Sequence, residues 1–314
     1  MVGFATDYAG ESTSTAELEN TLKRIAEAGF SHIHWCHEWD GDYIYSQYEM
    51  LQIRQWMDRY GLRSKGLHAT EGSRRRTEYG KYKFRWVGQN RRDYTSENEF
   101  NRLAGVELIR NRVDMACALG ASEIVLHMQL PYVSFEESAD FRNRYYRQVC
   151  KSLDELQEEC KAKGVRICIE NLLGTPDEHQ HYQFDMLFDR YDADFLGFCF
   201  DTGHAFITSE GKDMLELARR YKDRMFAIHM SDNLGIMSKE CWKDDIAMTK
   251  CDLHRIPFNG DFDWNGFAKV LADSVYDLPV VLEISKRDMD DALFLKEALA
   301  AGERFTEMVK QYQK

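Results

Sequence analysis

Residues 149–171 read VCKSLDELQEECKAKGVRICIEN, and they contain the structural unit on which the fold of the whole chain depends. A helical pattern ends at Gly164, an apolar strand follows, and the strand ends on Glu170 and Asn171. Glycine is common directly after a helix because it adopts a left-handed backbone conformation at little steric cost. The stretch therefore predicts a helix followed by a buried strand with a polar end.

The same unit recurs three times, in residues 14–35, 50–70 and 109–128. In each segment a helical pattern ends at a glycine, and these glycines are Gly29, Gly61 and Gly120. Ser14 and Glu17 have the spacing of a capping box, which predicts paired hydrogen bonds at the start of the first helix. Helix and strand therefore alternate, which is typical of a parallel sheet.

Four more apolar runs have the length of strands, at residues 2–8, 195–201, 225–232 and 278–285. Eight candidate strands in 314 residues favour a TIM barrel over an open doubly wound sheet. Only four prolines are present and no linker composition divides the chain. We therefore expect an α/β fold with a single (β/α)8 TIM barrel domain spanning residues 1–314.

Composition and charge restrict the class of partner. The formal net charge of −12 opposes binding to nucleic acid or to an anionic membrane. No run of 18 apolar residues and no signal peptide are found, so we expect a cytoplasmic protein without a membrane partner. The eight cysteines form no CxxC pair and are expected to be reduced core thiols.

The sequence predicts a metal cofactor and no nucleotide cofactor, since neither GxGxxG nor GxxxxGK[ST] occurs. In a closed barrel the C-terminal ends of all strands meet at one mouth. Polar residues stand at six of the predicted ends, and they are His68, His127, Glu170, Asp201, His229 and Glu283. A divalent cation compensates several such carboxylates at once, and imidazole with carboxylate suits Mn²⁺, Co²⁺, Fe²⁺, Zn²⁺ or Mg²⁺.

Five motifs resemble the xylose-isomerase-like TIM barrel superfamily, which includes the sugar phosphate isomerases and epimerases. In chain order they are CIEN (168–171), CFDTGHA (199–205), AIHMSDN (227–233), CDLHRIPFNGDFDW (251–264) and VVLEIS (280–285). The superfamily also contains inosose dehydratases and zinc-dependent apurinic endonucleases. The resemblance implies one divalent metal ion with four ligands, which are Glu170, Asp201, His229 and Glu283.

The resemblance leaves the number of metal ions open. In the endonuclease branch two further zinc ions are bound at positions that here carry His68, His127, His204, Asp252 and His254. In the sugar-modifying branch surplus histidines would bind substrate hydroxyls or move protons. Both interpretations predict that these residues lie at the mouth of the barrel.

Two loops are expected to cover the mouth. The lid-like insertion after the third strand has eight basic, three acidic and five aromatic residues between Glu71 and Tyr94. It suits contact with substrate, an interface with a second copy or a partner subunit, or a nucleic-acid strand. The long loop after the seventh strand, residues 231–264, places Asp232 close to His229 in sequence. Asp232 is therefore a possible additional ligand, a partner that orients a ligand, or a substrate contact. In this loop Asp263 is expected to cap the next helix.

Trp35 and Trp39 lie at the end of the second predicted strand, in HIHWCHEWDGDY. Either ring would suit stacking on the face of a sugar, although core packing is the alternative for at least one of them.

These features predict a divalent-metal-dependent isomerase or epimerase acting on a small carbohydrate. A proton is removed beside a carbonyl to give a metal-stabilised enediolate, with Glu170 and Glu283 as base and acid on opposite faces. His204 and His127 are expected to hydrogen-bond substrate oxygens. The alternatives are an enediolate-type lyase, such as the catalytic subunit of a C-glycoside deglycosidase acting on 3-keto glycosides, and a zinc-dependent apurinic endonuclease-like phosphodiesterase.

Overall fold

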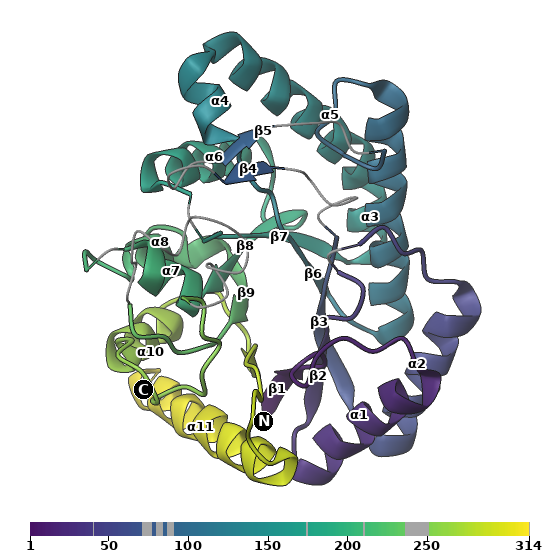
Figure 1. Ribbon diagram of the computed structural model, residues 1–314, viewed down its shortest axis with the longest axis vertical. Coiled ribbons are helices and arrows are strands. Elements are labelled where there is room, and N and C mark those ends of the chain that lie inside the picture. Colours follow the sequence, from purple (N-terminus) through teal and green to yellow (C-terminus); the bar gives the residue numbers. More distant parts are fainter. Residues whose placement is uncertain are drawn as a thin grey trace.

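Eight parallel strands form the centre of the molecule (Figure 1). The structure, a computed structural model, describes residues 1–39, 41–70, 77–79, 84–86, 91–173, 175–209, 211–235 and 251–313. The strands are β1 (Val2–Ala5), β2 (His32–Trp35), β3 (Arg63–His68), β6 (Glu123–Leu126), β7 (Arg166–Glu170), β8 (Leu196–Asp201), β9 (Met225–His229) and β10 (Val280–Leu282). Their order in the sheet is β10-β1-β2-β3-β6-β7-β8-β9.

The sheet closes between β9 and β10 through a single bridge. Met230, directly after β9, pairs in parallel with Leu282. Its N–H donates to the carbonyl of Val281 at 3.0 Å, and its carbonyl accepts from the N–H of Glu283 at 3.1 Å. The predicted (β/α)8 barrel is confirmed, and its strands all direct their C-terminal ends to one mouth.

Helices surround the ring of strands (Figure 1). They are α1 (Thr15–Ala28), α2 (Gln47–Tyr60), α3 (Glu99–Leu119), α4 (Tyr132–Glu137), α5 (Ala139–Lys163), α6 (Asp177–Arg190), α7 (Thr202–Thr208), α8 (Glu216–Arg220), α10 (Trp264–Ala272) and α11 (Asp291–Tyr312). A short 3-10 helix spans Lys222–Arg224. The main hydrophobic core fills the space between the outer faces of the strands and these helices.

The helix ends follow the glycine pattern, whereas one predicted cap does not form. Gly29, Gly61, Gly120 and Gly164 all end helices in the left-handed conformation. Ser14 is the N-cap residue of α1, but its side chain accepts no capping hydrogen bond. The capping box lies instead at α2, where Ser46 and Glu49 bond each other's backbone N–H. The box does not form at Ser14 because the backbone N–H of Ser14 donates to Ser12 Oγ, and this local turn replaces it.

A layer of small side chains lies inside the barrel, two residues before the polar side chains at the strand ends. Val125, Cys168, Cys199 and Ala227 form this cluster separately from the main core. Since side chains alternate between the two faces of a strand, residues two positions further on share the same face. Those residues are His127, Glu170, Asp201 and His229. The interior packing therefore forms the floor of the polar mouth.

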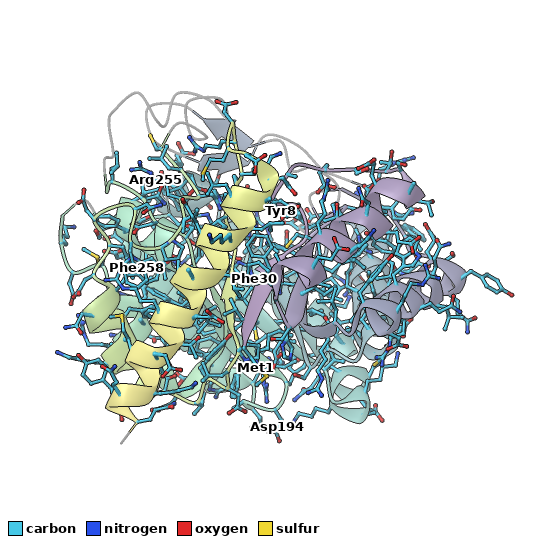
Figure 2. All side chains as sticks on the ribbon, turned by 90° about the horizontal axis from the view of Figure 1, so that it is seen from below. Met1, Tyr8, Phe30, Asp194, Arg255 and Phe258 are labelled. Atoms are coloured by element: carbon cyan, nitrogen blue, oxygen red, sulfur yellow. The ribbon has the colours of Figure 1, made fainter. Side chains whose placement is uncertain are left out.

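The insertion after β3 contains an antiparallel hairpin, β4 (Thr77–Tyr79) and β5 (Phe84–Trp86). The hairpin lies on the mouth side of the barrel, and β5 runs beside α4 (Figures 1 and 2). Residues 71–76, 80–83 and 87–90 of the predicted lid lie outside the described residues, as do residues 236–250 of the loop after β9. The predicted cap at Asp263 is confirmed, because its Oδ1 accepts from the N–H of Gly266 at 2.9 Å.

The expectation of reduced core thiols holds for only part of the cysteines. Cys36, Cys160, Cys168 and Cys199 are free and buried, whereas Cys117 is free but exposed. Cys251 is disulfide-bonded, so the expectation is wrong there. It lies in the partly exposed loop after β9 and not in the core, which is why core packing does not determine its state.

None of the described helices has the length and apolar character that crossing a lipid bilayer requires.

Candidate metal centre and substrate pocket

Four side chains converge at the ends of four strands. Glu170, Asp201 and His229 are the last residues of β7, β8 and β9, and Glu283 directly follows β10. One ligand atom from each lies within 4.8 Å of the corresponding atoms of the others. Glu170, Asp201 and His229 are at most 1% exposed. The four residues that the sequence resemblance indicated are therefore brought into one group.

The polar atoms of this group fit a divalent metal ion. Glu170 Oε1, Asp201 Oδ2 and His229 Nδ1 are buried, and none of them makes a hydrogen bond of regular geometry within the described residues. Glu170 Oε1 and His229 Nδ1 do have ionic contacts at 3.1–3.3 Å. Leaving buried polar atoms unsatisfied is costly, and buried carboxylates need compensating charge. Carboxylate oxygen with imidazole nitrogen is a donor set that Mn²⁺, Co²⁺, Fe²⁺ and Zn²⁺ accept. The arrangement therefore suits one such ion at these three atoms and Glu283.

Asp201 is held so that one of its oxygens faces the group. Its Oδ1 accepts from the N–H of His204 at 2.6 Å and caps α7. Asn171 fixes the backbone of Asp201 on both sides, with its Nδ2 donating to the carbonyl and its Oδ1 accepting from the N–H. Gly203 permits this turn, because a Cβ atom there would overlap the side chains of Ser231 and Asn233.

His229 presents Nδ1 to the two glutamates. This atom lies 3.2 Å from Glu170 Oε2 and 3.3 Å from Glu283 Oε2. On the other side of the ring, Nε2 lies 3.2 Å from His34 Nε2. The sequence analysis missed His34, although it alternates with Ile33 and Trp35 on β2, a spacing that places it on the inner face.

A second group of possible ligands shares Glu170. Its Oε2 lies 3.2 Å from His127 Nε2 and 3.8 Å from His68 Nε2, and the three residues meet the same 4.8 Å criterion. Burial, reinforced by His127, lowers the pKa of His68 to about 3 and keeps it neutral. Tyr94 donates its hydroxyl to the carbonyl of His127 and so fixes the end of β6 from the insertion.

A third set forms a chain of hydrogen bonds. Asp252 Oδ2 accepts from His254 Nε2 at 2.8 Å and lies 3.4 Å from His204 Nε2. Burial opposes the charged form of His204, but the carboxylates of Asp201 and Asp252 outweigh it and raise its pKa well above the usual value. For His254 burial also opposes the charge, and Asp252 raises the pKa to about 10. These contacts favour the cationic form of both imidazoles.

These sets surround a cavity of about 200 Å³. Its polar lining includes Trp39, His68, His127, His204, Asp252, His254 and Glu283. A volume below the ~300–1,000 Å³ of drug-sized pockets suits a small polar ligand. Asp7 also lines the cavity, and the sequence analysis missed it although it stands at the end of the first predicted strand. Burial, reinforced by Glu283, raises the pKa of Asp7 to about 6.

The two tryptophans of the second strand end lie in different environments. Trp39 contacts the rings of His68 and His127, with centroids 4.5 and 4.7 Å apart. Trp35 is 1% exposed in the core, where its Nε1 donates to Tyr45 Oη at 2.9 Å. Only Trp39 is therefore placed to contact a ligand, because Trp35 is on the outer face of β2.

Asp232 lies apart from the cavity. Its Oδ2 accepts from Trp264 Nε1 at 2.8 Å, and its Oδ1 accepts from the backbone N–H of Asn233 and Phe262. Both of its oxygens accept hydrogen bonds from residues of the loop after β9, so its position indicates that it orders this loop.

Comparisons with known proteins agree with this fold. Residues 22–305 match the family model described as xylose isomerase-like TIM barrel. The uncharacterized protein y4fM of Sinorhizobium fredii is 31% identical over 297 residues, which cover 93% of this chain and 89% of that protein. Inosose dehydratase of Lacticaseibacillus casei is 26% identical over 180 residues, which cover 54% of this chain and 59% of that enzyme. The solved structure of L-ribulose 3-epimerase superposes with a TM-score of 0.68 at 15% identity, and the match covers 99% of this chain and 95% of that chain.

Proposed function

This chain belongs to the xylose isomerase-like TIM barrel family, and from that premise we propose that it is a divalent-metal-dependent isomerase or epimerase of a sugar or keto-sugar. The observation that carries the proposal is the pair Glu170 and Glu283, whose carboxylates approach the same nitrogen of His229 at the edge of a small polar cavity. Two carboxylates beside a metal ion can serve as base and acid in proton transfer at a carbon next to a carbonyl.

The metal ion, held by Glu170, Asp201, His229 and Glu283, would supply electrophilic polarisation of the carbonyl and hydroxyl oxygens of the substrate. Trp39 would contact one face of the sugar, and the histidines of the cavity would orient its hydroxyl groups. The walls contributed by these side chains would exclude water from the reacting carbon.

The two glutamates differ in access to the substrate. Glu283 lines the cavity, whereas the side chain of Glu170 is 0% exposed. His127 lines the cavity and contacts Glu170 at 3.2 Å, and His204 does so at 3.1 Å. We therefore assign direct proton transfer to Glu283, and on the opposite face a transfer in which Glu170 acts through His127 or His204.

The proposal is tested by solvent exchange. The metal-loaded protein is incubated in deuterated water with a panel of ketohexoses, ketopentoses and keto-inositols, and carbon-bound deuterium is measured by NMR. We expect incorporation at the carbon beside the carbonyl of at least one compound, with loss of incorporation after chelation. An absence of exchange with every compound by a fully metal-loaded protein would contradict the proposal.

Elimination is the alternative that starts from the same proton abstraction. The similarity to inosose dehydratase is the observation that favours it, because that enzyme is named for the removal of water. A lyase would remove water from a keto-sugar or the aglycone from a 3-keto glycoside. An epimerase would instead give the same compound with inverted configuration at one carbon. Mass spectrometry of the products separates the two outcomes.

Phosphodiester cleavage at abasic DNA is the candidate from a different class. It is favoured by the nine possible ligands, since His68 and His127 meet Glu170 while His204, Asp252 and His254 form a neighbouring chain. The net charge of −12 opposes it, because there are few cations to replace the counterions of a DNA backbone. Salt-sensitive binding and incision of an abasic duplex would establish this activity, and we expect neither at physiological salt.

A further inference from the structure

A second cavity lies beside the substrate pocket. Its volume is about 460 Å³, and it shares Ser285 with the pocket described above. Three cationic side chains line it, with Arg255 from the loop after β9 and Lys286 and Arg287 from the loop after β10. Figure 2 shows Arg255 on the mouth side of the barrel, far from Met1 at the opposite end. In a chain with a net charge of −12, this is a local concentration of positive charge.

Arg255 is fixed in position, and its side chain has no charged partner among the described residues. Its backbone exchanges two hydrogen bonds with Asp232, at 2.8 and 3.0 Å, so the start of its side chain is held against an ordered loop. The partly buried guanidinium forms no ion pair or hydrogen bond with another residue in the described part of the chain. Five donor hydrogens are therefore available to a ligand in the cavity.

The other two cations are only partly satisfied. Lys286 Nζ lies 3.6 Å from Asp291 Oδ1, a carboxylate that is shared with Arg24. Arg287 donates one Nη2 hydrogen to the carbonyl of Leu253 at 2.7 Å, which ties the β10 loop to the β9 loop. The guanidinium and ammonium groups therefore approach one space from two loops that are bonded to each other.

We propose that this cavity binds a compact anionic group, a phosphate or a carboxylate, at the end of the substrate remote from the reacting carbon. Arginine and lysine donors hold such groups through charge-assisted hydrogen bonds. The walls contributed by Ile256 and Phe294 reduce the screening of these charges by water. In TIM barrels the loops after the seventh and eighth strands often hold phosphate, and β9 and β10 are the seventh and eighth strands of this barrel. That the anion belongs to the substrate rests on the proposed function of the adjoining pocket.

Anion binding is tested by calorimetric titration of the metal-loaded protein with inorganic phosphate and, separately, with acetate. We expect saturable binding of at least one anion, weakened about tenfold or more by Arg255→Gln and by Lys286→Gln. The matched controls are Arg304→Gln and Lys296→Gln, two exposed residues of α11 that do not line the cavity, and each should change the affinity less than twofold. Absence of saturable binding, or equal weakening in the controls, would overturn the proposal.

A second titration decides whether the anion is part of the substrate. D-fructose 6-phosphate should bind at least about tenfold more tightly than inorganic phosphate, because the linked sugar occupies the adjoining pocket. Equal affinities would overturn the assignment to the substrate and leave a site for a free anion. Metal content and solvent exchange are measured on the same preparations. If the protein binds no anion but still exchanges the substrate proton with solvent, this inference alone is refuted. If it binds the anion but exchanges no substrate proton, the proposed function alone is refuted.

Discussion

The Nε2 atoms of His34 and His229 lie 3.2 Å apart inside the barrel, although 195 positions separate the two residues in the chain. If His229 bound a metal ion through Nδ1, its ring proton would be on Nε2 and would be donated to His34. Burial, reinforced by the neighbouring His229 and His68, lowers the pKa of His34 well below its usual value and keeps it a neutral acceptor. His34 is therefore placed to orient His229, the proposed metal ligand, as a hydrogen-bond acceptor.

Replacement of His34 should weaken metal binding. His34→Leu removes the acceptor that orients His229, and a loss of about 10–100-fold in metal affinity is expected for an orienting partner of this kind. His34→Gln retains an acceptor and should restore most of the affinity. Competition with a chromophoric chelator measures both variants, and unchanged affinity in folded His34→Leu would show that the contact has no influence on the metal site.

The two glutamates are separated by conservative amide variants. Glu283→Gln and Glu170→Gln keep side-chain size but cannot accept a proton, so each should lower turnover by about two to four orders of magnitude. Solvent exchange is measured in variants shown to retain metal. If both still exchange at the parent rate while His204→Ala or His127→Ala does not, proton transfer belongs to a histidine and the glutamates bind metal only.

Metal removal should lower stability as well as activity. We expect one divalent ion per chain by elemental analysis, bound to the group around His229. At a metal concentration one hundred times the dissociation constant, binding contributes about 2.7 kcal/mol to the free energy of unfolding. Thermal unfolding with and without chelator measures the difference. Three zinc ions per chain would favour the phosphodiesterase alternative.

Gly203→Ala should disturb the metal centre through packing. The added Cβ would overlap Ser231 Oγ and would approach Asn233 Nδ2 to 2.6 Å, so the turn that carries Asp201 must shift. A cost of about 1–3 kcal/mol in the free energy of unfolding is expected for overpacking, together with weaker metal binding. Gly41→Ala is the control, since a Cβ there meets nothing within 4 Å. Denaturant unfolding of both variants in the presence of metal gives the comparison, and equal stabilities would argue against the packing constraint.

The fold was predictable because its determinants are local. A helical pattern that ends at Gly164 and a strand that ends at Glu170 are read from neighbouring residues, and the same holds for each repeat of the unit. Barrel closure then brings strand ends together by geometry alone, which is why six polar strand ends could be assigned to one mouth without coordinates. The family resemblance, and not this geometry, selected four of them as metal ligands, and they are Glu170, Asp201, His229 and Glu283.

What only the tertiary structure decided depends on contacts between distant segments. Sequence patterns did not separate Trp35 from Trp39, because which face of β2 and its loop meets the core is set by partners such as Tyr45. Asp232 is close in sequence to His229 at the end of β9, yet its carboxylate accepts a hydrogen bond from Trp264 Nε1 and is directed into the loop. The sequence alone determined that the polar ends of the strands meet at the mouth of the barrel. The packing of side chains from different strands and loops determined which of their atoms remain free for a metal ion or a substrate.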